Sequence, residues 1–123
     1  MLLVSLLLLA LSLGLAQAQC PPNVTSVFIL NDRTINVPLT EPLCLQCRFL
    51  DIQTGNFLTF SDGVWRKGSD VLNDDGNIDI SSTSNPSTII LFMTNPDAVV
   101  NVNDALTCAS PSTSQHIVTL GPF

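Results

Sequence analysis

Residues 43–47 read Leu43-Cys44-Leu45-Gln46-Cys47, and this stretch decides the fold. Side chains alternate across a β-strand, so the two leucines and Cys47 would share one apolar face, whereas Cys44 falls on the opposite, polar face. Trp65 follows Cys47 by 18 positions and Cys108 follows it by 61. These residues predict two sheets that are joined by a disulfide and packed against a large aromatic side chain.

The chain contains four cysteines, which allow three disulfide pairings. Because Cys47 lies on the apolar face of its strand, it should cross the core to Cys108. Cys44 faces outward near the domain edge, which leaves it for Cys20 in the N-terminal segment. In the loop-entropy model, a bridge that closes about 60 residues contributes roughly 4 kcal/mol to stability.

The N-terminus predicts secretion, which makes disulfides the expected state of the cysteines. Residues 1–14 are almost wholly apolar and uncharged, and small residues precede a cleavage point after Ala18. We interpret 1–18 as a signal peptide and 19–123 as a single domain. A membrane anchor is disfavoured because the apolar run is shorter than the roughly 20 residues of a spanning helix, and we expect no membrane insertion elsewhere in the given chain.

The composition argues against some partners. The formal net charge is −6, and the only cations are Arg33, Arg48, Arg66 and Lys67. Such a chain has no basic stripe that could neutralise phosphates, so nucleic acids and anionic membrane surfaces are poor partners.

Turn signals divide the chain into seven to nine short strands without helical periodicity. The expected strand segments are 23–30, 34–39, 43–50, 64–68, 71–72, 77–80, 88–93, 99–108 and 116–120. Pro38 and Pro42 place the second segment at a sheet edge, where it should switch or bend. Residues 51–63 form either a short extra strand or a long loop with an apolar tip. The pattern predicts an all-β, two-sheet antiparallel sandwich.

Three motifs resemble those of the immunoglobulin superfamily. Leu45-Gln46-Cys47 resembles its second-strand L-x-C motif, Trp65-Arg66-Lys67-Gly68 with Leu72 resembles its third-strand W-x-K-x-G-x-x-L motif, and Leu106-Thr107-Cys108 occupies its sixth-strand cysteine position. The resemblance implies an Ig-like domain over the mature chain, with a Cys47–Cys108 inter-sheet disulfide, Trp65 packed on it, and Leu45 and Leu106 in the core. Leu106 replaces the family's corner tyrosine. The alternative is another secreted disulfide-bonded sandwich, such as a fibronectin-like one.

Cysteine chemistry other than disulfides is disfavoured. Cys44 and Cys47 have C-x-x-C spacing, but a redox motif needs a following helix to lower the thiol pKa, and the local pattern is a strand. Zinc binding with Cys108 and His116 has the right ligand count but is unusual in a secreted chain. The lone His116 is interpreted as a surface residue.

The remaining acidic motif is interpreted as a turn. Asp74, Asp75 and Asp79 surround Gly76, but their spacing fails the EF-hand register. With no Gly-x-Ser-x-Gly elbow either, we predict no enzyme activity, no metal and no cofactor.

Two loops are candidates for recognition, since an Ig-like topology would bring 53–63 and 110–115 to the same end. The first carries Phe57, Leu58 and Phe60. The alternative is that its phenylalanines extend the core.

The predicted function is extracellular recognition of a protein or glycan, with self-association as a further expectation. The domain would be secreted, or held at the cell surface as the first domain of a longer protein. The alternative is a small secreted effector, such as an inhibitor or defence protein. Asn23-Val24-Thr25 is a glycosylation sequon, and we expect a glycan on Asn23.

Overall fold

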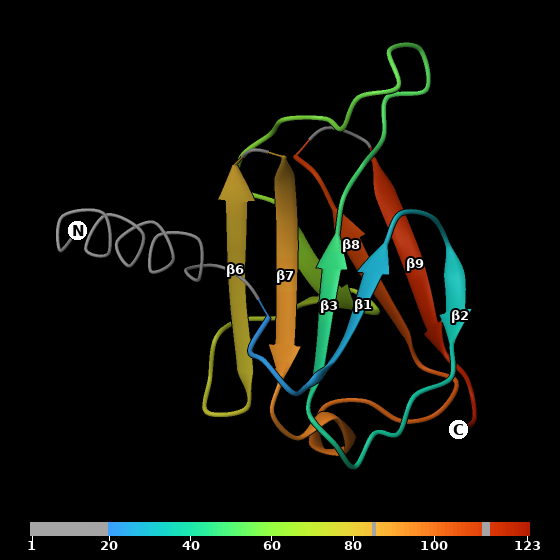
Figure 1. The fold of residues 1–123 in the computed structure, drawn as a ribbon. Helices are drawn as coiled ribbons and strands as arrows, with labels where there is room; N and C mark the ends of the chain where they lie inside the picture. Colours follow the sequence, from blue (N-terminus) through green and yellow to red (C-terminus); the bar gives the residue numbers. More distant parts are fainter. Residues whose placement is uncertain (1–19, 85, 112–113) are drawn as a thin grey trace, which may run out of the picture.

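The computed structural model describes residues 20–84, 86–111 and 114–123, so the predicted signal peptide at 1–18 lies outside the described residues. The described chain forms two β-sheets that pack face to face (Figure 1). The elements are β1 (Thr25–Ile29), β2 (Arg33–Ile35), β3 (Leu43–Cys47), β4 (Val64–Lys67), β5 (Asp70–Val71), β6 (Ile78–Ser84), β7 (Ser87–Met93), a 3-10 turn η1 (Pro96–Ala98), β8 (Ala105–Ala109) and β9 (Gln115–Leu120). Within the described ranges, no helix has the length and apolar character that a membrane crossing would require.

The sheets have the strand orders β1-β3-β7-β6 and β2-β9-β8-β4-β5, which confirms the predicted all-β, two-sheet sandwich. Most neighbouring strands are antiparallel, as expected. Two edge pairings are parallel, β1 with β3 and β2 with β9, and the sequence analysis did not anticipate them. They arise because β1 runs beside β3 in one sheet, the chain turns at residues 30–32, and β2 then runs back beside β9 in the other sheet (Figure 1).

The predicted second strand is shorter than expected but lies at a sheet edge, as its prolines indicated. β2 ends at Ile35, and the following residues leave the ladder before Pro38. Val37 and Leu39 still pack against the core from this irregular segment. Their alternation with polar residues therefore predicted correctly that they face the core, although they are not part of a strand.

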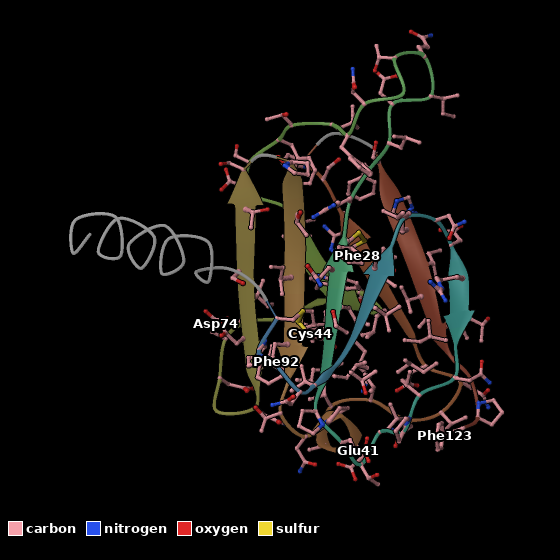
Figure 2. All side chains as sticks on the ribbon, viewed as in Figure 1. Phe28, Glu41, Cys44, Asp74, Phe92 and Phe123 are labelled. Atoms are coloured by element: carbon pink, nitrogen blue, oxygen red, sulfur yellow. A yellow bond between two sulfur atoms is a disulfide. The ribbon has the colours of Figure 1, made fainter. Side chains whose placement is uncertain are left out.

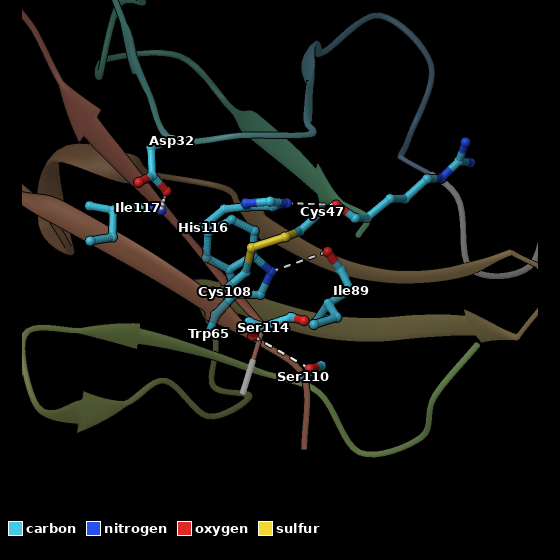
Figure 3. The surroundings of a disulfide bond; sticks show 10 residues. Asp32, Cys47, Trp65, Ile89, Cys108, Ser110, Ser114, His116 and Ile117 are labelled. Atoms are coloured by element: carbon cyan, nitrogen blue, oxygen red, sulfur yellow. Dashed lines mark hydrogen bonds between the residues drawn. A yellow bond between two sulfur atoms is a disulfide. The ribbon is translucent and has the colours of Figure 1, made fainter. Parts of the chain in front are cut away.

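A single core lies between the sheets, and the residues expected in it are buried. Leu45, Trp65 and Leu106 have no solvent exposure. The Cys47–Cys108 disulfide joins β3 in one sheet to β8 in the other. The Trp65 indole Nε1 donates a hydrogen bond of 3.2 Å to the Ile89 carbonyl of the opposite sheet (Figure 3). The predicted disulfide clasp and its aromatic support are both present.

The second predicted disulfide, Cys20–Cys44, is also present, although Cys44 is buried. Its side chain has no solvent-accessible area. Strand alternation does place it on the outer face of the four-stranded sheet, where Phe92 of β7 is its neighbour (Figure 2). The bridge covers Cys44 because it holds the N-terminal segment against this outer face.

One further boundary differs from the prediction, and the alternatives left open for 51–63 are decided in favour of the loop. β8 begins at Ala105, not at residue 99, because the preceding residues form η1 and a loop closed by Lys67. The Lys67 ammonium donates to the Val99 carbonyl over 2.8 Å and pairs with Asp104 over 3.7 Å. The segment 51–63 is a loop whose only strand-like feature is an isolated bridge between Leu50 and Phe57.

The edge strand β6 is longer than expected, and the acidic turn before it caps its first residues. Asp75 Oδ1 accepts hydrogen bonds from the backbone N–H groups of Asn77 and Ile78, over 2.7 and 2.8 Å. Asp74 Oδ1 accepts one from Ile80 N–H over 2.6 Å. Edge strands with free N–H groups invite pairing with other chains, so these carboxylates protect the edge.

The two disulfides should contribute unequally to stability. Substituting Cys47 and Cys108 with Ala opens a loop whose ends are 61 positions apart in sequence and leaves a gap beside Trp65. Substituting Cys20 and Cys44 with Ala opens a loop whose ends are only 24 positions apart. We expect losses of more than about 4 kcal/mol and of about 3 kcal/mol, respectively. Urea unfolding of the two double variants measures both values. A larger loss for the Cys20/Cys44 variant would contradict the role given to the core disulfide.

Candidate functional site

Large apolar side chains are exposed mainly at one end of the four-stranded sheet. Nine large hydrophobic residues are exposed in the described chain, and five of them come from residues 28–30 and 50–57. These five are Phe28, Leu30, Leu50, Ile52 and Phe57. Single exposed apolar residues are ordinary, but a contiguous group of them marks an interaction surface.

The register explains why these side chains meet. β1 runs parallel to β3, and Arg48 N–H donates to the Ile29 carbonyl over 3.0 Å. Alternation then puts Phe28 and Leu30 on the outer face beside Arg48 and Leu50. The bridge from Leu50 brings Phe57 to the same face. We call Phe28, Leu30, Arg48, Leu50 and Phe57 the Arg48 surface.

The Arg48 guanidinium contacts two aromatic rings. Its central carbon is 4.9 Å from the centroid of Phe28 and 5.5 Å from that of Phe57. Both distances are within the range of cation–π attraction, which is worth about 0.5–1 kcal/mol at an exposed site. Phe28 and Phe57 keep 46% and 37% of their area exposed, so the rings hold the arginine without burying it.

A buried threonine fixes the inner end of the same guanidinium. Arg48 Nε donates to Thr88 Oγ1 over 2.9 Å, and Thr88 Oγ1 in turn donates to the Pro86 carbonyl over 3.2 Å. Thr88 is only 1% exposed. The side chain is therefore held at its Nε edge, and its two terminal nitrogens are left for other contacts.

No carboxylate of the described residues pairs with Arg48. The one ion pair among these residues joins Lys67 to Asp104. The carboxylates nearest to the surface in sequence accept hydrogen bonds from backbone N–H groups: Asp32 accepts from Ile117 N–H, and Asp51 accepts from Gln53 N–H. Arg48 thus keeps a half-buried positive charge without a counter-ion in an acidic protein.

The predicted loop residues divide between surface and core. Phe57 belongs to the Arg48 surface. Leu58 and Phe60 pack against the core, and the Phe60 ring meets Phe49 edge-on at 5.7 Å between centroids. Phe60 is further held by Ser87, whose hydroxyl bonds to both its N–H and its carbonyl over 2.8 and 3.0 Å. For Leu58 and Phe60, the placement therefore favours the alternative that they extend the core.

The apolar tip expected for this loop is made by Ile52, which is 93% exposed. Its backbone is ordered by Asp51, whose carbonyl accepts from Gly55 N–H and whose own N–H donates to the Asn56 carbonyl, each over 2.8 Å. The tip extends beyond the end of the sandwich (Figure 1).

The described ends of the second predicted loop, residues 110–111 and 114–115, lie at the same end of the sandwich (Figure 1). Residues 112–113 lie outside the described residues. His116 follows this loop, and it is not the free surface residue that we expected. Its ring stacks on Phe49 with centroids 4.5 Å apart, and Nε2 is 2.9 Å from the Arg48 carbonyl (Figure 3). His116 therefore supports the backbone of Arg48 from within the sandwich.

A separate hollow of about 260 Å³ opens beside β4, β5 and β6. Apolar side chains and Asp74 line it. Small-molecule pockets usually enclose about 300–1,000 Å³, and this hollow is shallow and open. The Asp74 carboxylate in its lining already accepts a hydrogen bond from Ile80 N–H of β6, so this polar group serves the sheet edge. The Arg48 surface is the stronger candidate site.

Comparison with solved structures shows what the fold resembles. The I9–I11 tandem from titin superposes with a TM-score of 0.55 at 15% identity, over 77% of this chain and 32% of the tandem, so this chain spans about a third of it. The IG27 protein domain gives a TM-score of 0.55 at 10% identity, over 85% of this chain and 99% of that domain. No protein-family model and no curated protein matches the sequence. The likeness confirms the expected immunoglobulin-like fold.

The division of the loop between core and surface predicts different costs of substitution. Phe60→Ser should lower the free energy of unfolding by about 2–4 kcal/mol, because it removes a ring packed on Phe49 and leaves a polar group against the core. Phe57→Ser should cost about 1 kcal/mol, since it removes a partly exposed ring outside the core and one cation–π contact. Urea unfolding followed by tryptophan fluorescence measures both. Equal losses would contradict this assignment.

Proposed function

We propose that this protein is an extracellular, non-catalytic recognition domain that binds another protein through the Arg48 surface and the adjoining Ile52 tip. The observation that carries the proposal is the Arg48 side chain, which contacts Phe28 and Phe57 within a group of exposed apolar residues. Aromatic residues and arginine are the types that dominate binding energy at protein interfaces.

The two disulfides support an extracellular location. Disulfides persist in oxidising compartments and are rare in the cytosol. Together with the apolar leader in the sequence, they favour a secreted product. The same features fit the alternative, a small secreted effector, because an inhibitor also acts by binding a protein. The Arg48 surface would serve either role, so the proposal concerns recognition and not its biological outcome.

Self-association through the same surface is the second form that this function could take. Exposed apolar patches also bring copies of a chain together. Sedimentation of the protein at micromolar and millimolar concentrations distinguishes self-association from binding to a different protein. A protein that stays monomeric at both concentrations would leave the surface open for another partner.

The binding proposal can be tested with a pair of surface variants. Leu50→Ser with Ile52→Ser removes apolar area from the proposed surface, and Val71→Ser with Val102→Ser removes similarly exposed area elsewhere. The immobilised proteins are screened against the secreted and cell-surface proteins of the organism that makes the chain. The partner found with the unaltered protein should bind the first variant at least tenfold more weakly and the control normally.

Equal weakening in both variants would mean that the effect is general and would overturn the proposed site. Unchanged binding by the Leu50/Ile52 variant would overturn it as well. Because all four residues are exposed, unfolding temperatures should stay within a few degrees of one another, which keeps the comparison free of folding defects.

The sequon at Asn23 generates a further prediction. Asn23 is exposed and lies just before β1, whereas Phe28 lies near the end of that strand, so a glycan would not cover the Arg48 surface. Protein secreted from eukaryotic cells should shift to lower mass on treatment with an N-glycosidase, and Asn23→Gln should abolish that shift without weakening binding. No shift in the unaltered protein would contradict glycosylation.

A further inference from the structure

We propose that the partner of the Arg48 surface presents a carboxylate, an Asp or Glu side chain with apolar neighbours, that seats on the terminal nitrogens of Arg48. This inference rests on the proposed function and specifies the chemistry of the partner. The geometry points to it, because the guanidinium is held in place by three contacts and none of them supplies a negative charge.

The free edge of the guanidinium suits a carboxylate. The Nε atom donates to Thr88 Oγ1, and the rings of Phe28 and Phe57 both lie within cation–π distance of the guanidinium. The two terminal nitrogens have no acceptor among the described residues, and their parallel N–H groups match the two oxygens of a carboxylate. A prepositioned side chain loses little conformational freedom on binding, so more of the interaction energy appears as affinity.

The absence of an internal ion pair is informative in this protein. The sequence has ten acidic and four basic residues, so carboxylates are in excess. Arg48 nevertheless forms no ion pair in the described chain, and its contacts to Thr88 and the two rings leave its terminal nitrogens without an acceptor there. A carboxylate from another molecule would satisfy them.

The distribution of charge makes such an approach feasible despite the net negative charge. Four carboxylates, those of Asp70, Asp74, Asp75 and Asp79, lie on or between β5 and β6. These strands form the sheet edges opposite β1 and β2. Their repulsion is largely screened beyond about 8 Å at physiological salt.

A second cation lies beside the surface. Arg33 donates from its guanidinium to the Phe28 carbonyl over 3.3 Å, which places another positive charge next to the Phe28 ring. Arg33 and Arg48 thus place two cations beside the apolar residues, and the carboxylates nearest to them in sequence, Asp32 and Asp51, already accept backbone hydrogen bonds.

The apolar surroundings favour a protein carboxylate over an acidic sugar. Leu30, Leu50 and Ile52 are aliphatic and exposed. They offer no hydrogen bonds to sugar hydroxyls, which would lose their water without replacement. Leucine-like side chains on both sides of an Asp or Glu would instead bury apolar area against them.

The test uses two short peptides as probes, acetyl-Leu-Glu-Leu-amide and acetyl-Leu-Gln-Leu-amide, which differ only in the charged group. Each is titrated into ¹⁵N-labelled protein at pH 7, and the Nε–Hε signal of Arg48 is followed by NMR. We expect the Glu peptide to shift this signal and to bind at least fivefold more tightly than the Gln peptide, because charge-assisted hydrogen bonds are stronger than neutral ones.

Three variants give the controls. Arg48→Met keeps the aliphatic stem and should abolish the preference for the Glu peptide, whereas Arg48→Lys keeps the charge without the fork and should retain only part of it. Arg66→Met removes an equal charge from β4 in the other sheet and should leave the preference unchanged.

Equal affinities for the two peptides, a preference that survives in Arg48→Met, or no shift with either peptide would each overturn the inference. These outcomes are distinct from failure of the proposed function. If the Leu50/Ile52 variant loses its protein partner while the peptides show no preference, the surface binds through apolar contacts and only the carboxylate is excluded.

Discussion

The disulfide between Cys47 and Cys108 is the constraint on which the rest of the sandwich depends. It is the one disulfide that joins the two sheets in the described part of the chain, and it links them beside Trp65. The indole then bonds to the Ile89 carbonyl across the interface, so the same small region holds the sheets by a covalent bond, by packing and by a hydrogen bond. With the sheets fixed there, β3 presents its outer face to solvent in a defined position.

That outer face becomes a candidate site through the unusual path of the first strand. Because β1 runs parallel to β3, the Phe28 ring comes beside Arg48, and the chain then crosses to the other sheet through Arg33. The loop after β3 returns Phe57 to within cation–π distance of the same guanidinium. Contacts from three separate segments therefore meet at one side chain, whose rigidity comes from the fold and not from its own neighbours in sequence.

Much of the fold could be predicted from local pattern, whereas the site could not. Alternation around Cys47 identified the core face of β3, and the positions of Trp65 and Cys108 identified the second sheet. The same alternation put Arg48 on the outer face, but nothing in the sequence shows that β1 is its neighbour, since pairing between distant strands depends on topology. His116 was misjudged for a related reason: Phe49, on which its ring stacks, is its neighbour only in space.

The spacing of the two disulfides also determines how the domain would carry a mechanical load. Tension applied at Cys20 and at the chain beyond Cys108 passes through the first bridge to Cys44, along the backbone to Cys47, and through the second bridge to β8. Residues 21–43 and 48–107 lie outside this covalent path. In the oxidised protein, they can be stretched only after a sulfur–sulfur bond breaks, so most of the sandwich is shielded from extension even if its hydrogen bonds yield.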